Sequence, residues 1–482
     1  MTRTLHSGLG ALRSMISGSV HGPGDAGYDT ARSLWNGDID KHPAMIADCL
    51  SADDVSAALS FGREHGLEIA VRGGGHAFSG SSSVDDGLMI NLSAMNQVVV
   101  DPEAQLARVG GGATMADMDA ATQAHGLAVP GGTISHTGVG GLTLGGGMGW
   151  LTHTFGLAID NLAAAQVVLA DGSIVRASEQ ENADLFWGLR GGGGNFGVVT
   201  EFEFRLHRLG PEIHFGLFFW DSSAGADMLR MCREFLPTLP ERAGALMALG
   251  LSAPPEPFVP EQYHLMPGYA LLVAGFGTAE EHARMVAPIR DALPPLFEFI
   301  TPMPYTALQS LLDNAAPWGI LGYEKALDID DISDEAIAII TDSIGKKTSP
   351  LSFMPCFCLD GAFSAVGVDD TAFGGARTPH YVVNIAAVAT EPEVLATDKQ
   401  WARQTWKALE PLSSNPAGYI NFMAEPSEEL IRRSYGAKYA RLAALKTKYD
   451  PGNVLHRNAN FQMNAFLKDG GFVYVYGTPS GR

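Results

Sequence analysis

The spacing of apolar and polar residues in the first part of the chain predicts both helices and strands. Apolar side chains recur at helical spacing in Asp53–His65 and in Thr114–His125, and a glycine follows each segment where a helix would end. Short β-like runs predict three strands, at Leu67–Val71, Leu88–Leu92 and Ala107–Val109. This region is therefore expected to be α+β in character.

The rest of the chain adds strands and one late helix. Asp171-Gly172 is a strong hairpin signal because it stands between two β-like runs. The predicted strands of this part are Ala165–Leu169, Ser173–Ala177, Gly197–Leu206, Leu351–Leu359 and Tyr381–Ala387. A segment that carries Lys and Arg, Glu428–Tyr449, predicts a helix.

The chain is expected to contain more than one domain, because 482 residues exceed the usual size of ~100–200 residues per domain. Pro and Phe become frequent after Gly210-Pro211, which places a boundary near residue 208. The predicted parts are a first domain at 1–208 with its core at about 40–208, a second domain at 209–415, and a C-terminal segment at 416–482 that returns to the first domain.

Charge and cysteine content narrow the classes of function. Lys and Arg number 32 against 53 Asp and Glu, and the net charge of −21 repels phosphate backbones, so nucleic acid is not expected as a partner. The 4 cysteines are too few and too scattered for a disulfide-stapled secreted domain. No signal-peptide pattern precedes residue 27, so we expect a cytoplasmic protein.

Residues 120–159 contain no Asp, Glu, Lys or Arg and superficially resemble a membrane span. Eleven glycines interrupt the segment, whereas a spanning helix needs about 20 predominantly apolar residues. The segment is therefore expected to be a buried loop system, and no membrane association is predicted.

Several common chemistries find no support in the sequence. Gly192-x-Gly194-x-x-Gly197 matches the dinucleotide fingerprint, but a helix-like run precedes it and a β-like run follows, the reverse of the required context. No two histidines lie within six residues of each other, so no metal site is predicted. Cys356 and Cys358 are expected to pack in the core, and a GxSxG nucleophile elbow is absent.

The run Arg72-Gly73-Gly74-Gly75-His76 directly follows a predicted strand. Consecutive glycines expose backbone N–H groups that can hold an anion such as a pyrophosphate. The imidazole of His76 then lies beside whatever these amides bind, although a histidine that caps a tight turn is the alternative.

A second glycine-rich region holds nine glycines within residues 131–149, in Gly131-Gly132 and the motifs SHTGVGG and GGGMGWL, as expected where a large flat ligand lies against the backbone. Further motifs are RGGGGNFGVVT at 190–200, YINF at 419–422 and DPGNVLHRNAN at 450–460. Together with RGGGH they resemble the berberine-bridge-enzyme-like FAD-linked oxidases of the vanillyl-alcohol oxidase superfamily. The resemblance implies a PCMH-type FAD-binding domain of two α/β subdomains, and a substrate domain with an antiparallel sheet covered by helices.

The resemblance also implies a set of cofactor-binding residues. Residues 72–75 are expected to hold the FAD pyrophosphate, residues 132–146 to line the flavin, and residues 195–199 to contact the adenine half. His76 is expected to bond covalently to the flavin 8α-methyl group. The implied residues are Arg72, Gly73, Gly74, Gly75, His76, Ser79, Gly132, Thr133, His136, Thr137, Gly140, Gly141, Gly146, Asn195, Gly197, Val199, Asn458 and Asn460.

Two positions depart from the family pattern. Many relatives carry a second covalent link from a Cys at the position of Ile134, so a single histidyl link is predicted here. Several plant relatives carry a catalytic Tyr at the position of Phe422, so the base must come from elsewhere. The candidates are Tyr323 and Lys325, with Glu324 on the opposite side of an extended segment, and the pair Tyr419 and Asn421.

The implied activity is an FAD-dependent oxidase. Such an enzyme takes a hydride from a C–H bond next to O or N of a small alcohol, sugar or secondary metabolite and passes the electrons to O2, giving H2O2. The resemblance also implies that Thr137 lies close to where O2 reaches the flavin, and because it is smaller than Ile or Leu it is expected to permit the reaction with O2. The alternative for Thr137 is a hydroxyl that only bonds the flavin rim or a nearby carbonyl. The alternatives are an oxygenating or cyclising tailoring enzyme of natural-product biosynthesis and an FAD-binding protein without turnover. The expected assembly is a monomer or a homodimer.

Overall fold

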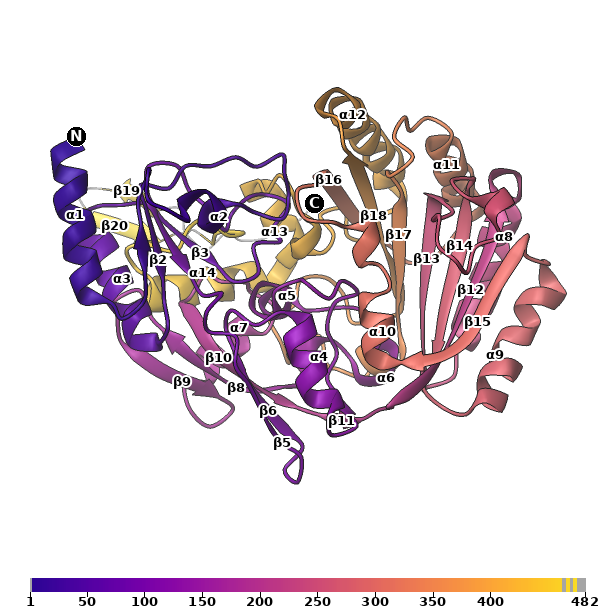
Figure 1. The fold of residues 1–482 in the computed structure, drawn as a ribbon, viewed down its shortest axis with the longest axis horizontal. Coiled ribbons are helices and arrows are strands. Elements are labelled where there is room, and N and C mark those ends of the chain that lie inside the picture. Colours follow the sequence, from indigo (N-terminus) through magenta and orange to yellow (C-terminus); the bar gives the residue numbers. More distant parts are fainter. Residues whose placement is uncertain (1, 462–464, 469–470, 475–482) are drawn as a thin grey trace.

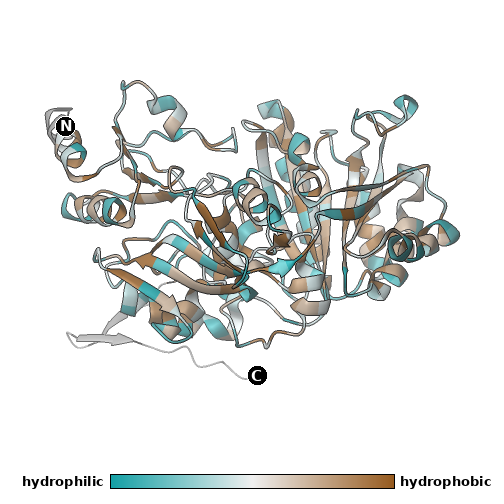
Figure 2. Cartoon of the chain, turned by 60° about the horizontal axis from the view of Figure 1, so that its bottom comes forward, coloured by the Kyte–Doolittle hydropathy of each residue, from teal (hydrophilic) through white to brown (hydrophobic). Residues whose placement is uncertain are grey.

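The computed structural model describes residues 2–461, 465–468 and 471–474 of the chain. Two β-structured halves lie side by side: the sheets of the first half of the sequence are on the left in Figure 1, and a seven-stranded sheet is on the right. Figure 2 shows hydrophobic residues concentrated on the interior strands and polar residues on the outer helices and loops. The predicted α+β fold class is confirmed.

A four-stranded sheet begins the first half. Its strands follow the order β1, β2, β4, β3, with β2, β4 and β3 parallel to one another. Helix α3 packs on it and shares a core with α1, since Leu12, Leu59 and Ile90 belong to one apolar cluster. The elements are α1 (Thr2–Met15), β1 (Val20–His21), α2 (Tyr28–Arg32), β2 (Met45–Asp48), α3 (Ala52–Glu64), β3 (Ile69–Arg72) and β4 (Leu88–Asn91).

An antiparallel five-stranded sheet, in the order β5, β6, β10, β8, β9, completes the first half. Its strands are β5 (Val98–Asp101), β6 (Leu106–Gly110), β8 (Leu162–Val168), β9 (Ile174–Ser178) and β10 (Val198–Arg205), and β7 (Leu127–Ala128) pairs separately with β11 (His207–Arg208). The helices are α4 (Met115–Gln123), α5 (Val139–Gly145), α6 (Thr152–Phe155), η1 (Ala158–Asp160) and α7 (Ala183–Leu189). The segment expected to be a buried loop system, 120–159, thus contains short helices.

An antiparallel seven-stranded sheet forms the second half, in the order β15, β12, β14, β13, β17, β18, β16. Its strands are β12 (Glu212–Asp221), β13 (Ala243–Ser252), β14 (Pro267–Gly275), β15 (Phe297–Pro304), β16 (Leu321–Ile329), β17 (Met354–Leu359) and β18 (His380–Ala389). These strands lie within the predicted second domain, and we keep its boundary near residue 208 as a proposal.

Helices cover one face of this sheet, and the first half of the molecule covers the other (Figure 1). Side chains alternate between the faces: Met247 and Tyr323 belong to the core under the helices, whereas Leu246 and Leu272 share a core with Trp150 of the first half. The helices on the outer face are α8 (Gly225–Phe235), α9 (Ala279–Ala292), α11 (Asp334–Ile344) and α12 (Pro392–Leu409), whereas α10 (Tyr305–Ser310) lies on the inner face and contacts α4. The 3₁₀ turns are η2 (Ser222–Ala224), η3 (Leu236–Thr238), η4 (Glu261–Tyr263), η5 (Asp313–Ala315), η6 (Gly361–Phe363) and η7 (Glu410–Leu412).

The C-terminal segment packs against the first half, since Leu442 and Phe461 share a core with Phe186 of α7. The sequence predicted one helix over 428–449, but there are two, because Gly436 adopts a φ of +50° between them. The elements are η8 (Ile420–Phe422), α13 (Glu428–Tyr435), η9 (Gly436–Lys438), α14 (Tyr439–Tyr449), β19 (Ala465–Lys468) and β20 (Gly471–Tyr474). The last residues of the predicted segment, 475–482, lie outside the described part of the chain.

Two searches of the described residues bear on the predicted partners. None of the helices is long and apolar enough to cross a membrane. No three His, Cys, Asp or Glu side chains in the described ranges gather as they would around a metal ion. Cys356 is buried in the core under the helices, with Cys358 packed against it, and both thiols are free.

Candidate active site

A cavity of about 1160 Å³ lies between the two halves of the molecule. Glycine-rich loops of the first half form one wall, and the inner face of the seven-stranded sheet forms the other. The 3₁₀ turn η8 closes one side of the cavity with Tyr419, Ile420, Asn421 and Phe422. Residues far apart in the sequence therefore share one site.

Backbone packing explains why the loop after β3 consists of glycines. A Cβ atom on Gly74 would lie 2.3 Å from the backbone N of Gly138, so the two glycine loops touch through their main chains. Gly75 has a φ of +70°, which other residues rarely adopt. At Gly141 a Cβ atom would meet no atom within 4 Å, and Gly141 lines the cavity. The loops thus present bare backbone to the cavity.

Most of the predicted cofactor-binding residues line this cavity. They are Gly73, Gly74, Gly75, His76, Ser79, Gly132, Thr133, Thr137, Gly140, Gly141, Gly197, Val199 and Asn458. The predicted residues that do not line it are Arg72, His136, Gly146, Asn195 and Asn460. The sequence motifs therefore surround one cavity, although some of their residues lie behind its wall and do not line it.

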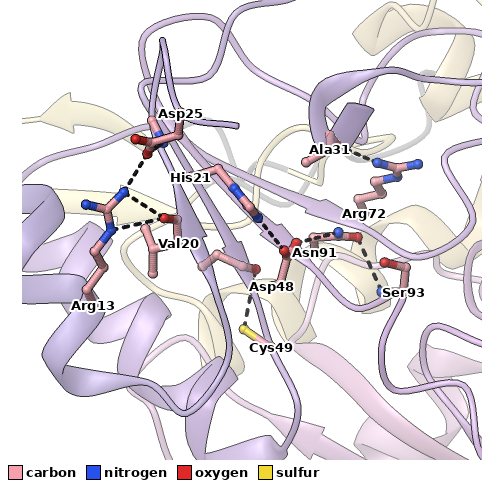
Figure 3. Close-up of polar contacts among 12 residues, drawn as sticks. Arg13, Val20, His21, Asp25, Ala31, Asp48, Cys49, Arg72, Asn91 and Ser93 are labelled. Carbon is pink, nitrogen blue, oxygen red and sulfur yellow. Dashed lines mark hydrogen bonds and ion pairs between the residues drawn. The ribbon is translucent and has the colours of Figure 1, made fainter. Parts of the chain in front are cut away.

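Arg72 and Asn195 show what such supporting positions do. The Arg72 side chain turns toward Ala31 and donates to its carbonyl oxygen over 2.5 Å (Figure 3). The buried Asn195 amide donates to the carbonyl oxygens of Gly192 and Ala459, each over 2.9 Å, and so ties the C-terminal segment to the loop before β10. Neither side chain is directed into the cavity in this arrangement.

His76 lies at the cavity wall in an aromatic and apolar setting. Its ring stacks on Trp35 with the ring centroids 4.7 Å apart, and its Nε2 lies 2.7 Å from Nδ1 of His136. Burial, with a smaller contribution from His136, lowers the pKa of His76 to about 3. The imidazole is therefore neutral at physiological pH and keeps a lone pair on one ring nitrogen.

The candidate bases at 323–325 divide between the two faces of β16. Tyr323 lies on the helix side, where its hydroxyl donates to Glu425 over 2.7 Å, and Lys325 lies over the ring of Trp406 in α12. Glu324 alternates to the other face and lines the cavity together with Asn384 of β18. The predicted alternation holds, but the cavity is on the side of Glu324, and Tyr323 and Lys325 are away from it.

Among the described residues, two acidic side chains line the cavity, Glu256 and Glu324, and only Glu324 is buried, with 1% of its surface exposed. Its Oε2 accepts a hydrogen bond from the Asn384 amide over 2.9 Å, while its Oε1 has no partner among the described residues. Burial raises the pKa of Glu324 well above its ordinary value, and the hydrogen bond from Asn384 only partly opposes this. A proton-binding group therefore faces the cavity.

Tyr419 and Asn421 meet at the edge of the cavity. The Tyr419 hydroxyl oxygen accepts hydrogen bonds from the backbone N of Gly147 over 2.8 Å and from the Asn421 amide over 2.7 Å. Burial raises the pKa of Tyr419 well above its ordinary value. The hydroxyl thus keeps its proton, and because both hydrogen bonds are accepted, that proton can be donated to a molecule in the cavity.

Asn384 and Trp35 were not predicted as site residues from the sequence. Trp35 precedes the predicted core of the first domain, and Asn384 stands inside an apolar strand. An isolated polar residue in such a strand was the signal that could have identified Asn384, because a buried amide needs hydrogen-bond partners.

The residues present fit a flavin dinucleotide. Bare backbone lines one side of a cavity large enough for a cofactor and a substrate, and a neutral histidine faces it, with one ring nitrogen that has no partner among the described residues. A buried carboxyl group and a hydroxyl group lie on the opposite wall and its edge. This arrangement can bind the cofactor and hold a substrate against it.

Comparisons with known proteins agree with this geometry. Residues 43–178 match the model of the FAD binding domain, and residues 418–461 match that of the berberine and berberine-like family. The chain is 30% identical over 455 residues to (R)-6-hydroxynicotine oxidase of Paenarthrobacter nicotinovorans, covering 92% of this chain and 96% of the relative.

Solved structures show the same fold. The crystal structure of 6-hydroxy-D-nicotine oxidase from Arthrobacter nicotinovorans superposes with a TM-score of 0.82 at 28% identity, covering 93% of this chain and 98% of that one. Glucooligosaccharide oxidase from Acremonium strictum, described with a 6-S-cysteinyl, 8α-N1-histidyl FAD, gives 0.81 at 26% identity over 95% and 99% of the two chains. The predicted FAD-linked oxidase is confirmed, and the chain belongs to the berberine-bridge-enzyme-like family of FAD-linked oxidoreductases.

Proposed function

We propose that this enzyme holds FAD by a single covalent bond, from His76 to the flavin 8α-methyl group. His76 lines the cavity between the two glycine loops. Ile134 also lines the cavity, at the position where many relatives carry a linking Cys, and its side chain has no nucleophile. The bare backbone of residues 73–75 and 138–141 supports placing the cofactor along these loops.

The bound FAD would accept a hydride at N5 from a C–H bond next to oxygen or nitrogen and pass the electrons to O2, which gives H2O2. The protein has to supply a base for the proton that leaves the substrate O–H or N–H. Glu324 carries this role in our proposal, because its carboxyl group is buried in the sheet wall of the cavity and its Oε1 has no partner in the described part of the chain. The raised pKa brings this carboxyl closer to the pH at which a general base works best.

Tyr419 orients the substrate in this proposal. Its hydroxyl is fixed from two sides by Gly147 and Asn421, so its remaining proton points in a set direction. A substrate oxygen or nitrogen that accepts this proton is held at one position relative to Glu324. Thr137 lines the cavity and leaves room for O2, which is consistent with an oxidase.

The substrate class follows from the sheet wall. Apart from Glu324 and Asn384, the side chains that the sheet strands present to the cavity are mainly apolar, among them Leu217, Leu246, Leu272, Pro355, Phe357 and Val388. Sugars carry hydroxyl groups on every side, and burying these without partners costs free energy. An apolar alcohol or amine with one reacting polar group, of the secondary-metabolite kind, therefore fits better than a sugar.

Acid precipitation of the purified protein tests the covalent link. Flavin colour is expected in the pellet of the natural protein and only in the supernatant of His76→Ala, which should still bind FAD through the backbone loops. Covalent flavin in His76→Ala would contradict the assignment. The amount of H2O2 formed per molecule of substrate consumed tests the oxidase reaction. An oxidase should give a ratio near one, whereas oxygen insertion gives a much lower ratio.

A further inference from the structure

His136 contacts His76 from behind the cavity wall. Nδ1 of His136 lies 2.7 Å from Nε2 of His76, and the two ring centroids are 4.8 Å apart. His136 is not among the residues that line the cavity. It therefore acts on a bound ligand only through His76.

The surroundings of His136 indicate which nitrogen of each ring carries the proton. The backbone carbonyl of Ala316, which accepts a hydrogen bond from the Trp35 indole over 2.7 Å, acts on His136 as an acceptor and favours its protonated form. Because a carbonyl only accepts, it favours the His136 tautomer that carries its proton on Nε2 and leaves Nδ1 as the acceptor toward His76. His76 then donates from Nε2, and its lone pair is on Nδ1, which has no hydrogen-bond partner among the described residues.

Building on the single histidyl link proposed above, we propose that His136 is the positioning residue for that link: it fixes His76 in the tautomer that attacks from Nδ1, and it accepts the Nε2 proton. In this step the Nδ1–C8α bond forms and a C–H bond of the 8α-methyl group breaks. Two electrons pass to the flavin, and O2 takes them onward as H2O2. The proton from the methyl group goes to solvent, and the Nε2 proton goes to Nδ1 of His136.

The surroundings of His136 suit a temporary positive charge. Asp313 of η5 accepts hydrogen bonds from the backbone N and the hydroxyl of Ser135, over 2.8 and 2.5 Å, and so lies next to His136. Its negative charge favours the protonated form of His136 and opposes the effect of burial. The second half of the molecule, which carries Asp313 and Ala316, thus helps to organise the linking histidine.

The test follows covalent loading of the full-length protein, produced in a riboflavin-starved auxotroph and then incubated with FAD. Acid-stable flavin is measured over time, and the linked nitrogen is identified by NMR of the isolated flavinyl peptide. The natural protein should load at Nδ1 alone. His136→Ala should load on the order of 100-fold more slowly and as a mixture of Nδ1 and Nε2 isomers, and added imidazole should restore part of the rate.

His136→Asn is the conservative variant, because its amide oxygen can accept the Nε2 proton in a hydrogen bond without removing it. It should keep the Nδ1 isomer but load slowly. His125→Ala is the control, because His125 is exposed at the end of α4. This variant should gain acid-stable flavin at the natural rate. If His136→Ala loads at the natural rate and at Nδ1 alone, the role of His136 is overturned while the histidyl link stands. Loss of non-covalent FAD binding in both His136 variants would overturn that role as well. Absence of acid-stable flavin in the natural protein would instead overturn the histidyl link itself.

Discussion

The Glu324–Asn384 pair is the most informative contact at the residue scale. Asn384 donates to one carboxylate oxygen, while Glu324 Oε1 and Asn384 Oδ1 are both buried and without partners among the described residues. A protonated carboxyl group satisfies both atoms, because its O–H can donate to the amide oxygen. This pairing therefore favours protonated Glu324, and the carboxylate forms only as the pH rises.

Replacing Glu324 tests its role as the base. Glu324→Gln keeps the shape and the hydrogen bond with Asn384 but cannot accept a proton, so reduction of the flavin by substrate should slow by on the order of 100-fold or more. Anaerobic rapid mixing with stopped-flow absorbance measures this step without O2. Glu256→Gln, at a half-buried position of the cavity lining, is the matched control and should react normally. Normal flavin reduction in Glu324→Gln would exclude Glu324 as the base.

The pH dependence of flavin reduction should also depend on the protonation of Glu324. Burial raises the pKa of Glu324 above the ordinary 4.5, so the active carboxylate is lost as the pH falls through this raised value. The rate should therefore increase with pH and reach its half-maximum well above pH 4.5, and Glu324→Gln should lack this limb. A rate that is flat down to pH 5 would show that the group is ionised throughout and contradict the raised pKa.

The sequence predicted the cofactor side of the site better than the substrate side. Glycine runs such as residues 73–75 are informative because the backbone geometry that requires them is local. Which face of residues 323–325 points inward depends on how β16 pairs with β18, a contact between segments about sixty positions apart in the chain. Local spacing gives the alternation but not its direction, and Glu324 was therefore passed over.

At the element scale, the contact between α4 and α10 contains a buried acid. Gln309 donates to Asp119 Oδ2 over 2.8 Å, while Asp119 Oδ1 and Gln309 Oε1 have no partners among the described residues. Burial raises the pKa of Asp119 to about 7. Protonated Asp119 and Gln309 can thus form two mutual hydrogen bonds across the two halves of the molecule.

This contact should make stability depend on pH. The raised pKa means that the stabilisation is complete below the unfolded value of about 3.8 and is lost as the pH rises through about 7. Asp119→Asn keeps both hydrogen bonds without an ionisable group, so it should be more stable than the natural protein at pH 8.5 by on the order of a few kcal/mol. At pH 5 the difference should be much smaller. Urea unfolding at both pH values measures it, and an equal difference at both would contradict a protonated Asp119.

Elements were predicted well where their signals are local. Helix α4 begins after Thr114, whose side chain forms a capping box with Asp117, and the β8–β9 hairpin turns at Asp171-Gly172. The break between α13 and α14 was missed because a single Gly436 inside a helical pattern does not by itself end a helix. The short helices within 120–159 were missed because glycine-rich segments have low intrinsic helix propensity.

At the scale of the whole molecule, a buried ion pair joins the two halves. Arg377 donates to both carboxylate oxygens of Asp160 over 2.9 and 2.8 Å, and the two side chains are 3% and 6% exposed. The guanidinium also lies between the rings of Phe363 and Phe373, with its carbon 5.0 Å from each ring centroid. Removing one partner would leave an uncompensated charge in this interior.

A double-mutant cycle tests this pair. Arg377→Met should lower the free energy of unfolding by about 3–5 kcal/mol, because Asp160 remains buried and charged. Adding Asp160→Asn should restore part of the loss, since both charges are then gone and the Asn oxygen can still accept from the backbone N of Leu157, as Asp160 does. Guanidinium unfolding of the three variants gives the coupling energy. Strictly additive losses would show that the two side chains do not interact in solution.

The order of strands in the sheets was beyond the reach of sequence spacing. In the seven-stranded sheet, β12 lies between β15 and β14, and the edge strand β16 pairs with β18 rather than with a sequence neighbour. Such pairings join segments separated by a helix or more, and the energy that selects them comes from the packed core as a whole. The antiparallel sheet of the second half was predicted from the family resemblance, because residue spacing alone does not show which strands pair.

The division of the cavity into a backbone-lined wall and a side-chain-lined wall has a consequence for how this enzyme can change. On the first wall several glycines leave no room for a side chain, because a Cβ atom at Gly74, Gly111 or Gly138 would lie within 3 Å of main-chain atoms. On the second, Leu246 and Phe357 come from central strands whose opposite face has its own core under the helices. New substrates can therefore be acquired by exchanging side chains on the sheet while the redox chemistry is inherited unchanged. Libraries for directed evolution belong on that wall.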